Sequence, residues 1–171
     1  MSVTRINGEN ASIKTEEEIV EEIVSSAVIK FKKRFPDVEV RVEAPEDFLM
    51  VPMGGTLIEQ VLVNLLENSV LHGKTTGLIR IIVERGEEKL FFIVRDDGKG
   101  IDETVLPDIF EGSLQPREGT ESDSKKNMGI GLSVCMSIIK AHKGNMTAEN
   151  MSTGGAQFTF WLPMKKETYG Y

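Results

Sequence analysis

Polar side chains recur every four residues in an otherwise apolar stretch, residues 56–73. The positions are Gln60, Asn64, Asn68 and His72, and nearly everything between them is Leu, Val or Ile. Residues four apart share one face of a helix, so the stretch predicts a helix with one polar stripe that is buried on most of its other sides. A buried amide without a partner costs about 1–3 kcal/mol. The stripe therefore indicates either a polar ligand beside the helix or amides that hydrogen-bond one another and the neighbouring backbone.

Two glycine-containing segments add candidate binding groups. In DDGKGI (96–101) the glycines would let the backbone pass close to a ligand while an Asp offers an acceptor, although DDG is also a common turn. In GIGL (129–132) we expect the glycines to open a helix, where free N–H groups and the helix dipole suit a phosphate. GIGL is neither a Walker A loop nor a dinucleotide-binding G-x-G-x-x-G sequence after a strand.

The elements that must position these groups follow from periodicity and turn residues. We expect helices over 15–35, with Thr15 as N-cap, over 56–73, over 102–110 and over 128–143. We expect strands over 38–42, 48–51, 78–84, 90–95, 145–150 and 157–162, the last four as two hairpins. Residues 111–127 have almost no apolar content, which is typical of a functional lid or of disorder, and we expect both. This order predicts an α+β sandwich, a mixed sheet with helices on one face.

Composition narrows the function. The 171 residues, 40% of them hydrophobic, fit one domain with a proper core. A net charge of −7 and a pI near 5.0 argue against nucleic-acid binding, although a small basic patch is compatible with them. One cysteine, Cys135, excludes an internal disulfide and, with two histidines, a zinc finger, which indicates a reducing compartment. No apolar run approaches the roughly 20 residues of a membrane span, and the start of the chain is not a signal peptide.

Together and in this order, the polar helix, DDGKGI, the lid and GIGL resemble the GHKL ATP-binding superfamily, specifically the catalytic and ATP-binding domain of sensor histidine kinases. The resemblance spans about residues 16–163 and implies a two-layer α+β sandwich of the GHKL (Bergerat) type, with a mostly antiparallel sheet and three main helices on one face. It implies an ATP-binding catalytic domain over 15–164 with a lid over about 111–127. Residues 1–14 are then a linker or the remnant of a preceding helical domain, and 165–171 a tail. Residues 45–73 are further similar to Kdp-type, potassium-responsive kinases of bacteria.

The resemblance also implies which residues bind ATP and Mg²⁺. Asn64 and Asn68 match the N box and would be catalytic, with Asn68 holding Mg²⁺ between the triphosphate oxygens. His72 falls where an aromatic or His lies against adenine, and Asp96 matches the carboxylate that accepts from the adenine amino group. The remaining matches are backbone beside the nucleotide: Gly98, Gly100 and Ile101 near adenine, and the glycine box Gly129, Gly131 and Leu132 at the phosphates.

The physical chemistry of these residues agrees with such roles. An Asn carbonyl is a hard oxygen ligand suited to Mg²⁺, and phosphoryl transfer needs mostly positioning and charge neutralisation rather than a nucleophile. In the ATPase branch of the superfamily a Glu stands at the place of Asn64 and activates water. An amide there suits transfer to a protein group.

The chain departs from the family pattern at several positions. Leu71 stands where these kinases usually carry Lys or Arg, Asn127 replaces the first glycine of the second box, and Ala156 replaces a common Thr. Phe110 matches the Phe motif, but the aromatic-Arg pair that usually follows is missing from residues 111–113. These departures imply weak nucleotide binding.

We therefore expect a protein-histidine kinase domain that phosphorylates a His on a separate dimerisation domain, because its own histidines, His72 and His142, lie in no phosphoacceptor motif. The implied partners are that domain and, indirectly, a response regulator, with the isolated domain a monomer. We expect a cytoplasmic domain whose parent protein is anchored in the bacterial inner membrane. His142 is expected to be a cation at a helix C-terminus and Cys135 a core residue. The alternatives are a docking module that keeps the fold without transfer and an anti-sigma-type Ser/Thr kinase, which Asn64 disfavours.

Overall fold

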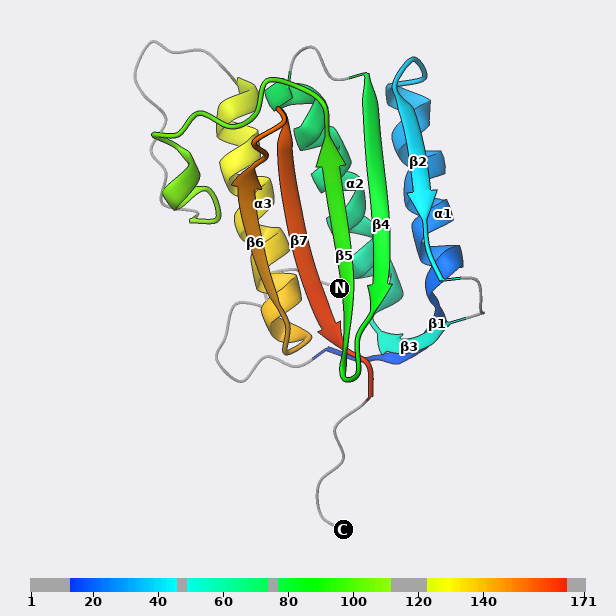
Figure 1. Cartoon of the computed structure of the whole chain (residues 1–171). Helices are drawn as coiled ribbons and strands as arrows, with labels where there is room; N and C mark the ends of the chain where they lie inside the picture. Colours follow the sequence, from blue (N-terminus) through cyan, green and yellow to red (C-terminus); the bar gives the residue numbers. More distant parts are fainter. Residues whose placement is uncertain (1–12, 46–48, 74–76, 112–122, 166–171) are drawn as a thin grey trace.

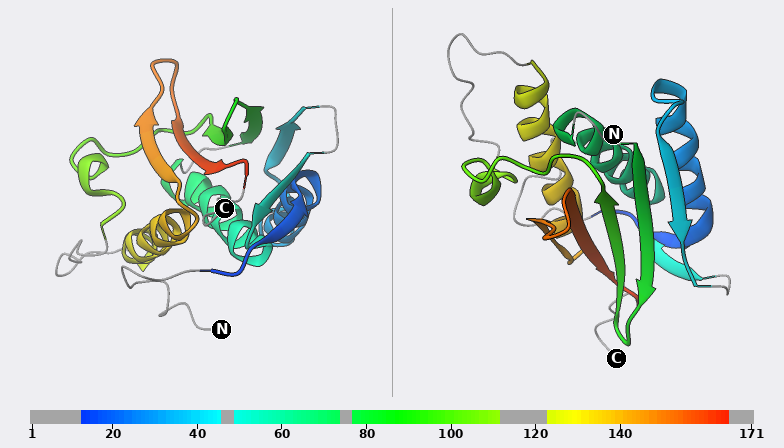
Figure 2. Two further views of the ribbon diagram at one scale, coloured as in Figure 1. Left: turned by 90° about the horizontal axis from the view of Figure 1, so that it is seen from below. Right: turned by 45° about the horizontal axis from the view of Figure 1, so that its top comes forward.

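Three helices cover one face of a five-stranded sheet (Figure 1, Figure 2). The structure, a computed structural model, describes residues 13–45, 49–73, 77–111 and 123–165. In chain order its elements are β1 (Glu16–Ile19), α1 (Val20–Arg34), β2 (Glu39–Glu43), β3 (Met50–Met53), α2 (Gly55–Gly73), β4 (Leu78–Arg85), β5 (Lys89–Asp96), the 3₁₀ turn η2 (Leu106–Asp108), α3 (Asp123–Ala141), β6 (Asn145–Asn150) and β7 (Ala156–Pro163). The expected two-layer α+β sandwich is confirmed. No helix in these ranges combines the length and the apolar character that crossing a membrane demands.

The sheet is mixed and mostly antiparallel, as the sequence predicts. Its order is β2-β4-β5-β7-β6, with β2 parallel to β4 and the other neighbouring pairs antiparallel. Alternate residues of β4 and β5 are buried, which is the period of two that a sheet with one covered face requires. These residues are Ile79, Ile81, Val83, Leu90, Phe92 and Val94. Both expected hairpins, β4–β5 and β6–β7, are confirmed.

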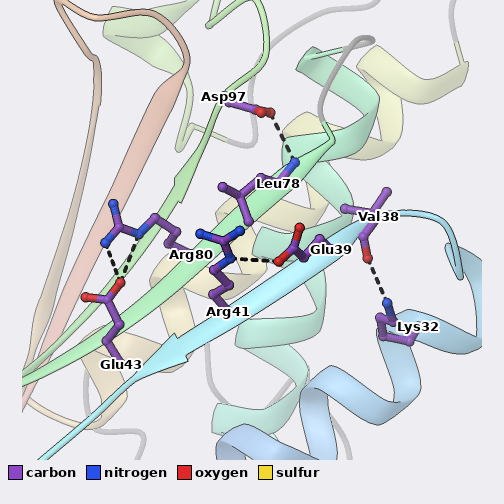
Figure 3. A network of polar contacts seen from close by, with 8 residues as sticks. All are labelled: Lys32, Val38, Glu39, Arg41, Glu43, Leu78, Arg80 and Asp97. Carbon is purple, nitrogen blue, oxygen red and sulfur yellow. Dashed lines mark hydrogen bonds and ion pairs between the residues drawn. The ribbon is translucent and has the colours of Figure 1, made fainter.

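Polar contacts fix how β2 lies against β4 and α1 (Figure 3). Arg80 on β4 pairs with Glu43 on β2. At the other end of β2, Lys32 Nζ donates to the Val38 carbonyl at 2.9 Å and ties α1 to the start of the strand. Exposed ion pairs typically contribute about 0–1 kcal/mol. The exposed Arg80–Glu43 pair therefore accompanies the register of β2 against β4 more than it stabilises the sheet.

The central element of the helical layer is α2, which packs against α1, α3 and the sheet (Figure 1). Five of its apolar side chains have no exposed surface: Ile58, Val61, Leu62, Leu65 and Leu66. Burying one such side chain contributes about 1.5–3 kcal/mol. The apolar positions of the sequence thus explain why this helix is enclosed on several sides.

The N-terminal boundary of the first helix was predicted wrongly. Thr15 is not an N-cap, because Glu16–Ile19 form β1 and α1 begins only at Val20. β1 pairs antiparallel with β3 in a separate two-stranded sheet, with Glu16 opposite Met53. This pairing joins segments far apart in the sequence, so the local pattern, which suits the first turn of a helix, does not reveal it. β3 also continues through Pro52, which was expected to end it and which a two-stranded sheet tolerates at its edge.

Two further helix boundaries differ from the prediction. The helix expected over 102–110 is reduced to η2, since Pro107 has no N–H and cannot continue an α-helical ladder. α3 begins at Asp123, five residues before the expected start at 128, and ends at Ala141. The part of the expected lid over 123–127 is therefore helical, and its residues 112–122 lie outside the described structure. Polar residues such as Lys125 and Lys126 are good helix formers, so low apolar content did not mark a loop.

His142 is not the helix C-terminal cation that the sequence predicts. Its side chain is buried, with Nδ1 2.8 Å from the Ile138 carbonyl, and its Nε2 accepts the Gly54 N–H at 2.9 Å. These contacts require a neutral ring with its proton on Nδ1, and burial lowers the pKa of His142 below the usual 6.5. His142 thus joins the residue after α3 to the residue before α2. Cys135 is a buried core residue, as expected.

The His142 contact should make the fold sensitive to acid. Because the folded-state pKa is lowered, the stabilisation is fully present above the unfolded value of 6.5 and is lost as the pH falls through the folded-state pKa, where protonation of Nε2 breaks the Gly54 bond. Urea unfolding between about pH 7.5 and about pH 5 should show a steeper loss of unfolding free energy in the wild type than in His142→Gln, whose amide does not titrate. Equal slopes would contradict this role.

Candidate functional site

The polar stripe of α2 is most deeply buried at Asn68. Gln60 is exposed, Asn64 and His72 are half-buried, and Asn68 is only 5% exposed. Asn68 Nδ2 donates to the Asn64 carbonyl at 2.7 Å, so the backbone satisfies the donor, as one interpretation of the stripe predicted. Asn68 Oδ1 is buried and has no hydrogen-bond partner among the described residues. That oxygen is therefore available for a ligand.

Asn64 faces α3. Its Nδ2 donates to Cys135 Sγ at 3.5 Å, and a Cβ added at Gly131 would lie 4.0 Å from the same nitrogen. Burial raises the pKa of Cys135 to about 12, so the sulfur is a thiol at neutral pH and accepts this weak bond without carrying charge. The structure thus brings Asn64 and Gly131, two residues of the predicted site, next to each other.

The glycine box is not at the start of a helix, as the sequence predicted. Gly129 and Gly131 lie inside α3, beyond its first turn, because the helix begins at Asp123. N–H groups beyond the first turn of an α-helix are bonded within it. Leu132 is fully buried in the core. In this conformation the segment therefore offers no free N–H groups to an anion.

Asp96 ends β5 as a buried carboxylate. It is 5% exposed, and its Oδ1 accepts the Gly98 N–H at 2.9 Å and the Ala156 N–H at 3.3 Å. Burial raises the pKa of Asp96, while these two bonds and one with the Ser69 side chain partly offset the effect. A carboxylate has room for about four hydrogen bonds, so Asp96 can still accept from a ligand donor.

The turn after Asp96 is fastened to the C-terminal end of α2. The Lys99 N–H donates to the Gly73 carbonyl at 3.3 Å, and Ser69 contacts Asp96 itself. Asp97 Oδ1 accepts an N–H bond from Gly77 at 3.0 Å. It also accepts one from Leu78 at 3.2 Å (Figure 3), and both bonds tie the turn to the start of β4. The unpartnered oxygen of Asn68 and the carboxylate of Asp96 consequently lie at one end of the sandwich. Together they offer an oxygen ligand for a hard cation and an acceptor for an amino group.

The β6–β7 turn also contacts this site, and no local pattern in the sequence indicates that contact. Gly155 has a φ of +88°, and a Cβ there would lie 2.0 Å from the Asp96 carbonyl oxygen. Its neighbour Gly154 has a φ of +106° and nothing within 4 Å of such a Cβ. Two adjacent glycines fit a turn between the strands of a hairpin, but only the fold shows that one of them lies against Asp96.

Comparison with known proteins agrees with this architecture. A family model described as "Histidine kinase-, DNA gyrase B-, and HSP90-like ATPase" matches residues 54–166. The sensor protein KdpD of Clostridium acetobutylicum is 40% identical over 164 residues, which cover 95% of this chain and 18% of that protein. The sensor protein KdpD of Escherichia coli strain K12 is 30% identical over 165 residues, which cover 96% of this chain and 18% of that protein. This chain thus spans about a fifth of the length of these relatives.

A solved structure has the same fold along most of its length. The catalytic domain of histidine kinase ThkA, in a nucleotide-free form, matches with a TM-score of 0.75 and 26% identity, over 90% of this chain and 97% of that chain.

The effect of the close approach of Gly155 to Asp96 on stability can be measured by comparing alanine substitutions at Gly155 and at its neighbour Gly154. Each substitution, Gly155→Ala and Gly154→Ala, should lower the free energy of unfolding by about 1–2 kcal/mol, because it places a Cβ on a left-handed backbone. Gly155→Ala should lower the free energy of unfolding by at least about 1 kcal/mol more than Gly154→Ala, since its Cβ would overlap the Asp96 carbonyl. Urea unfolding of the two variants provides the comparison. Equal losses would contradict the packing of Gly155 against Asp96.

Proposed function

This chain belongs to the family of histidine kinase-, DNA gyrase B- and HSP90-like ATPases, and we propose that it is the ATP-binding catalytic domain of a two-component sensor histidine kinase. In this proposal it transfers the γ-phosphoryl group of ATP to a His on a separate dimerisation domain. One observation carries the proposal: Asn68 Oδ1 is buried and has no hydrogen-bond partner in the described part of the chain, and it lies on the helix whose Ser69 contacts Asp96. The KdpD proteins support a sensor kinase as the parent.

The proposed binding residues fit the groups of Mg-ATP. Asn68 Oδ1 would hold Mg²⁺, which when bound neutralises charge on the triphosphate oxygens. Asp96 would accept from the adenine amino group, with His72 and the backbone of Gly98, Gly100 and Ile101 beside the base. Asn64 would stay neutral beside the transferred group, because an amide cannot take a proton from water.

The phosphate end is proposed at Gly129, Gly131 and Leu132. Their N–H groups lie within α3, so we expect the first turns of this helix to unwind when a triphosphate binds. Leu71 is 41% exposed at the end of α2 and offers no charge there. Both features support weak binding of the phosphates.

The remaining assignments concern the parent protein. We propose residues 15–164 as the catalytic domain, cytoplasmic and joined to a parent anchored in the bacterial inner membrane. A response regulator would receive the phosphoryl group from the His domain. We propose potassium as the signal of the parent protein, because residues 45–73 are similar to those of Kdp-type kinases.

The metal assignment predicts a selective loss in Asn68→Ala. ATP affinity should fall about tenfold or more with Mg²⁺, equivalent to about 1.4 kcal/mol, and much less in excess chelator. Calorimetric titration under both conditions measures the difference. Gln60→Ala, which removes an exposed amide of the same stripe, is the matched control and should leave both affinities unchanged. Equal losses with and without Mg²⁺ in Asn68→Ala would remove Asn68 from metal binding.

The transfer reaction tests the function itself. Mixed with γ-labelled ATP alone, the chain should not label itself, because neither His72 nor His142 lies in a phosphoacceptor motif. It should not hydrolyse ATP appreciably either, because it carries Asn64 where the ATPase branch has a Glu. When the dimerising His domain of the parent kinase is added, that domain should become labelled through an acid-labile, base-stable bond. An acceptor domain with its His replaced is the control. If ATP binds and the acceptor stays unlabelled, the chain is a docking module instead.

A further inference from the structure

Asn150, the last residue of β6, makes two hydrogen bonds to one distant residue. Its Oδ1 accepts the Ile101 N–H at 2.7 Å, and its Nδ2 donates to the Ile101 carbonyl at 2.9 Å. The side-chain amide thus satisfies both backbone groups of Ile101, as a neighbouring strand would. Ile101 is only 3% exposed. Buried backbone groups need such partners, so loss of Asn150 would leave this residue without them.

The same amide packs against Gly100. This glycine has a φ of +92°, and a Cβ there would lie 2.8 Å from Asn150 Oδ1. The amide therefore occupies the space that a side chain at residue 100 would take. Asn150 fixes the last two residues of the segment 96–101, and both contacts come from the end of one strand.

The first residue of the segment is held by the same hairpin. The Ala156 N–H donates to Asp96 Oδ1, and Gly155 lies against the Asp96 carbonyl. The Met151 N–H in turn donates to the Gly155 carbonyl at 2.9 Å, which closes the hairpin turn between Asn150 and Ala156. The β6–β7 hairpin thus contacts segment 96–101 at both of its ends.

We propose that Asn150 is a positioning residue for nucleotide binding, which acts through Ile101 and Gly100 to keep the backbone beside Asp96 in its binding conformation. The proposal rests on the proposed ATP-binding function. If segment 96–101 were flexible in the free protein, ATP binding would have to order it. The conformational entropy lost in that step would make the binding free energy less favourable. With Asn150 in place, segment 96–101 is ordered before the nucleotide binds.

Two variants and one control test this role. Asn150→Ala removes both bonds, whereas Asn150→Asp keeps the shape and the acceptor but loses the donor. Thr147→Ala is the control, because Thr147 is exposed on the same strand and pairs with Thr159. NMR titration at neutral pH should show ATP affinity about fivefold or more lower in Asn150→Ala and Asn150→Asp, the scale of one or two lost hydrogen bonds, and unchanged in Thr147→Ala. Thermal unfolding of each variant establishes that it is folded.

A double-mutant cycle separates positioning from general stability. If Asn150 acts through the turn beside Asp96, Asn150→Ala should cost little further ATP affinity in an Asp96→Ala background. Additive losses, or an unchanged affinity in Asn150→Ala, would overturn the proposal.

Amide exchange of nucleotide-free protein keeps this test independent of ATP. The Ile101 amide should exchange at least about tenfold faster in Asn150→Ala than in the wild type or Thr147→Ala, because its acceptor is gone. If the wild type failed to bind ATP, the proposed function would fall, and Ile101 exchange would still decide whether Asn150 holds the turn. Equal Ile101 protection in the wild type and Asn150→Ala would overturn the positioning role.

Discussion

The buried carboxylate of Asp96 is the constraint around which the binding end of the domain is arranged. A charge taken out of water is tolerated only when hydrogen-bond donors surround it. The donors come from three places: Gly98 in the following turn, Ala156 at the start of β7, and Ser69 on α2. Satisfying one carboxylate thus requires a turn, a strand and a helix to meet. The arrangement still leaves the carboxylate able to accept from a bound molecule.

Much of the fold could be predicted because local patterns and packing agree. The apolar positions of α2 recur with helical spacing, and the alternation in β4 and β5 has the period of a half-covered sheet, so both were predicted to within a few residues. Asn68 was predicted as a site residue because it belongs to a polar stripe in an otherwise apolar helix, and Asp96 because it begins the glycine-containing segment DDGKGI. Their assignment to particular ligands remains a proposal.

The features that the sequence did not reveal depend on partners far along the chain. β1 forms because Glu16–Ile19 meet Met50–Met53, and nothing within residues 16–19 distinguishes that strand from the first turn of a helix. Asn150 looks like an ordinary residue before a turn until Ile101 is found beside it. His142 seemed to be a helix-terminal cation, because neither its burial nor its bond to Gly54 is encoded nearby. Long-range hydrogen bonds were in each case what local periodicity could not supply.

The bond between Gly54 and His142 spans 88 residues and therefore bears on the order in which the chain can fold. During synthesis of the second half of the chain, α2 can form and pack against α1. The Gly54 N–H, just before α2, still lacks its acceptor at that stage. That acceptor arrives only after α3 has been synthesised and docked. Closing so long a loop is entropically costly, and topologies rich in distant contacts fold slowly. The start of the central helix is thus completed late, although it stands early in the sequence.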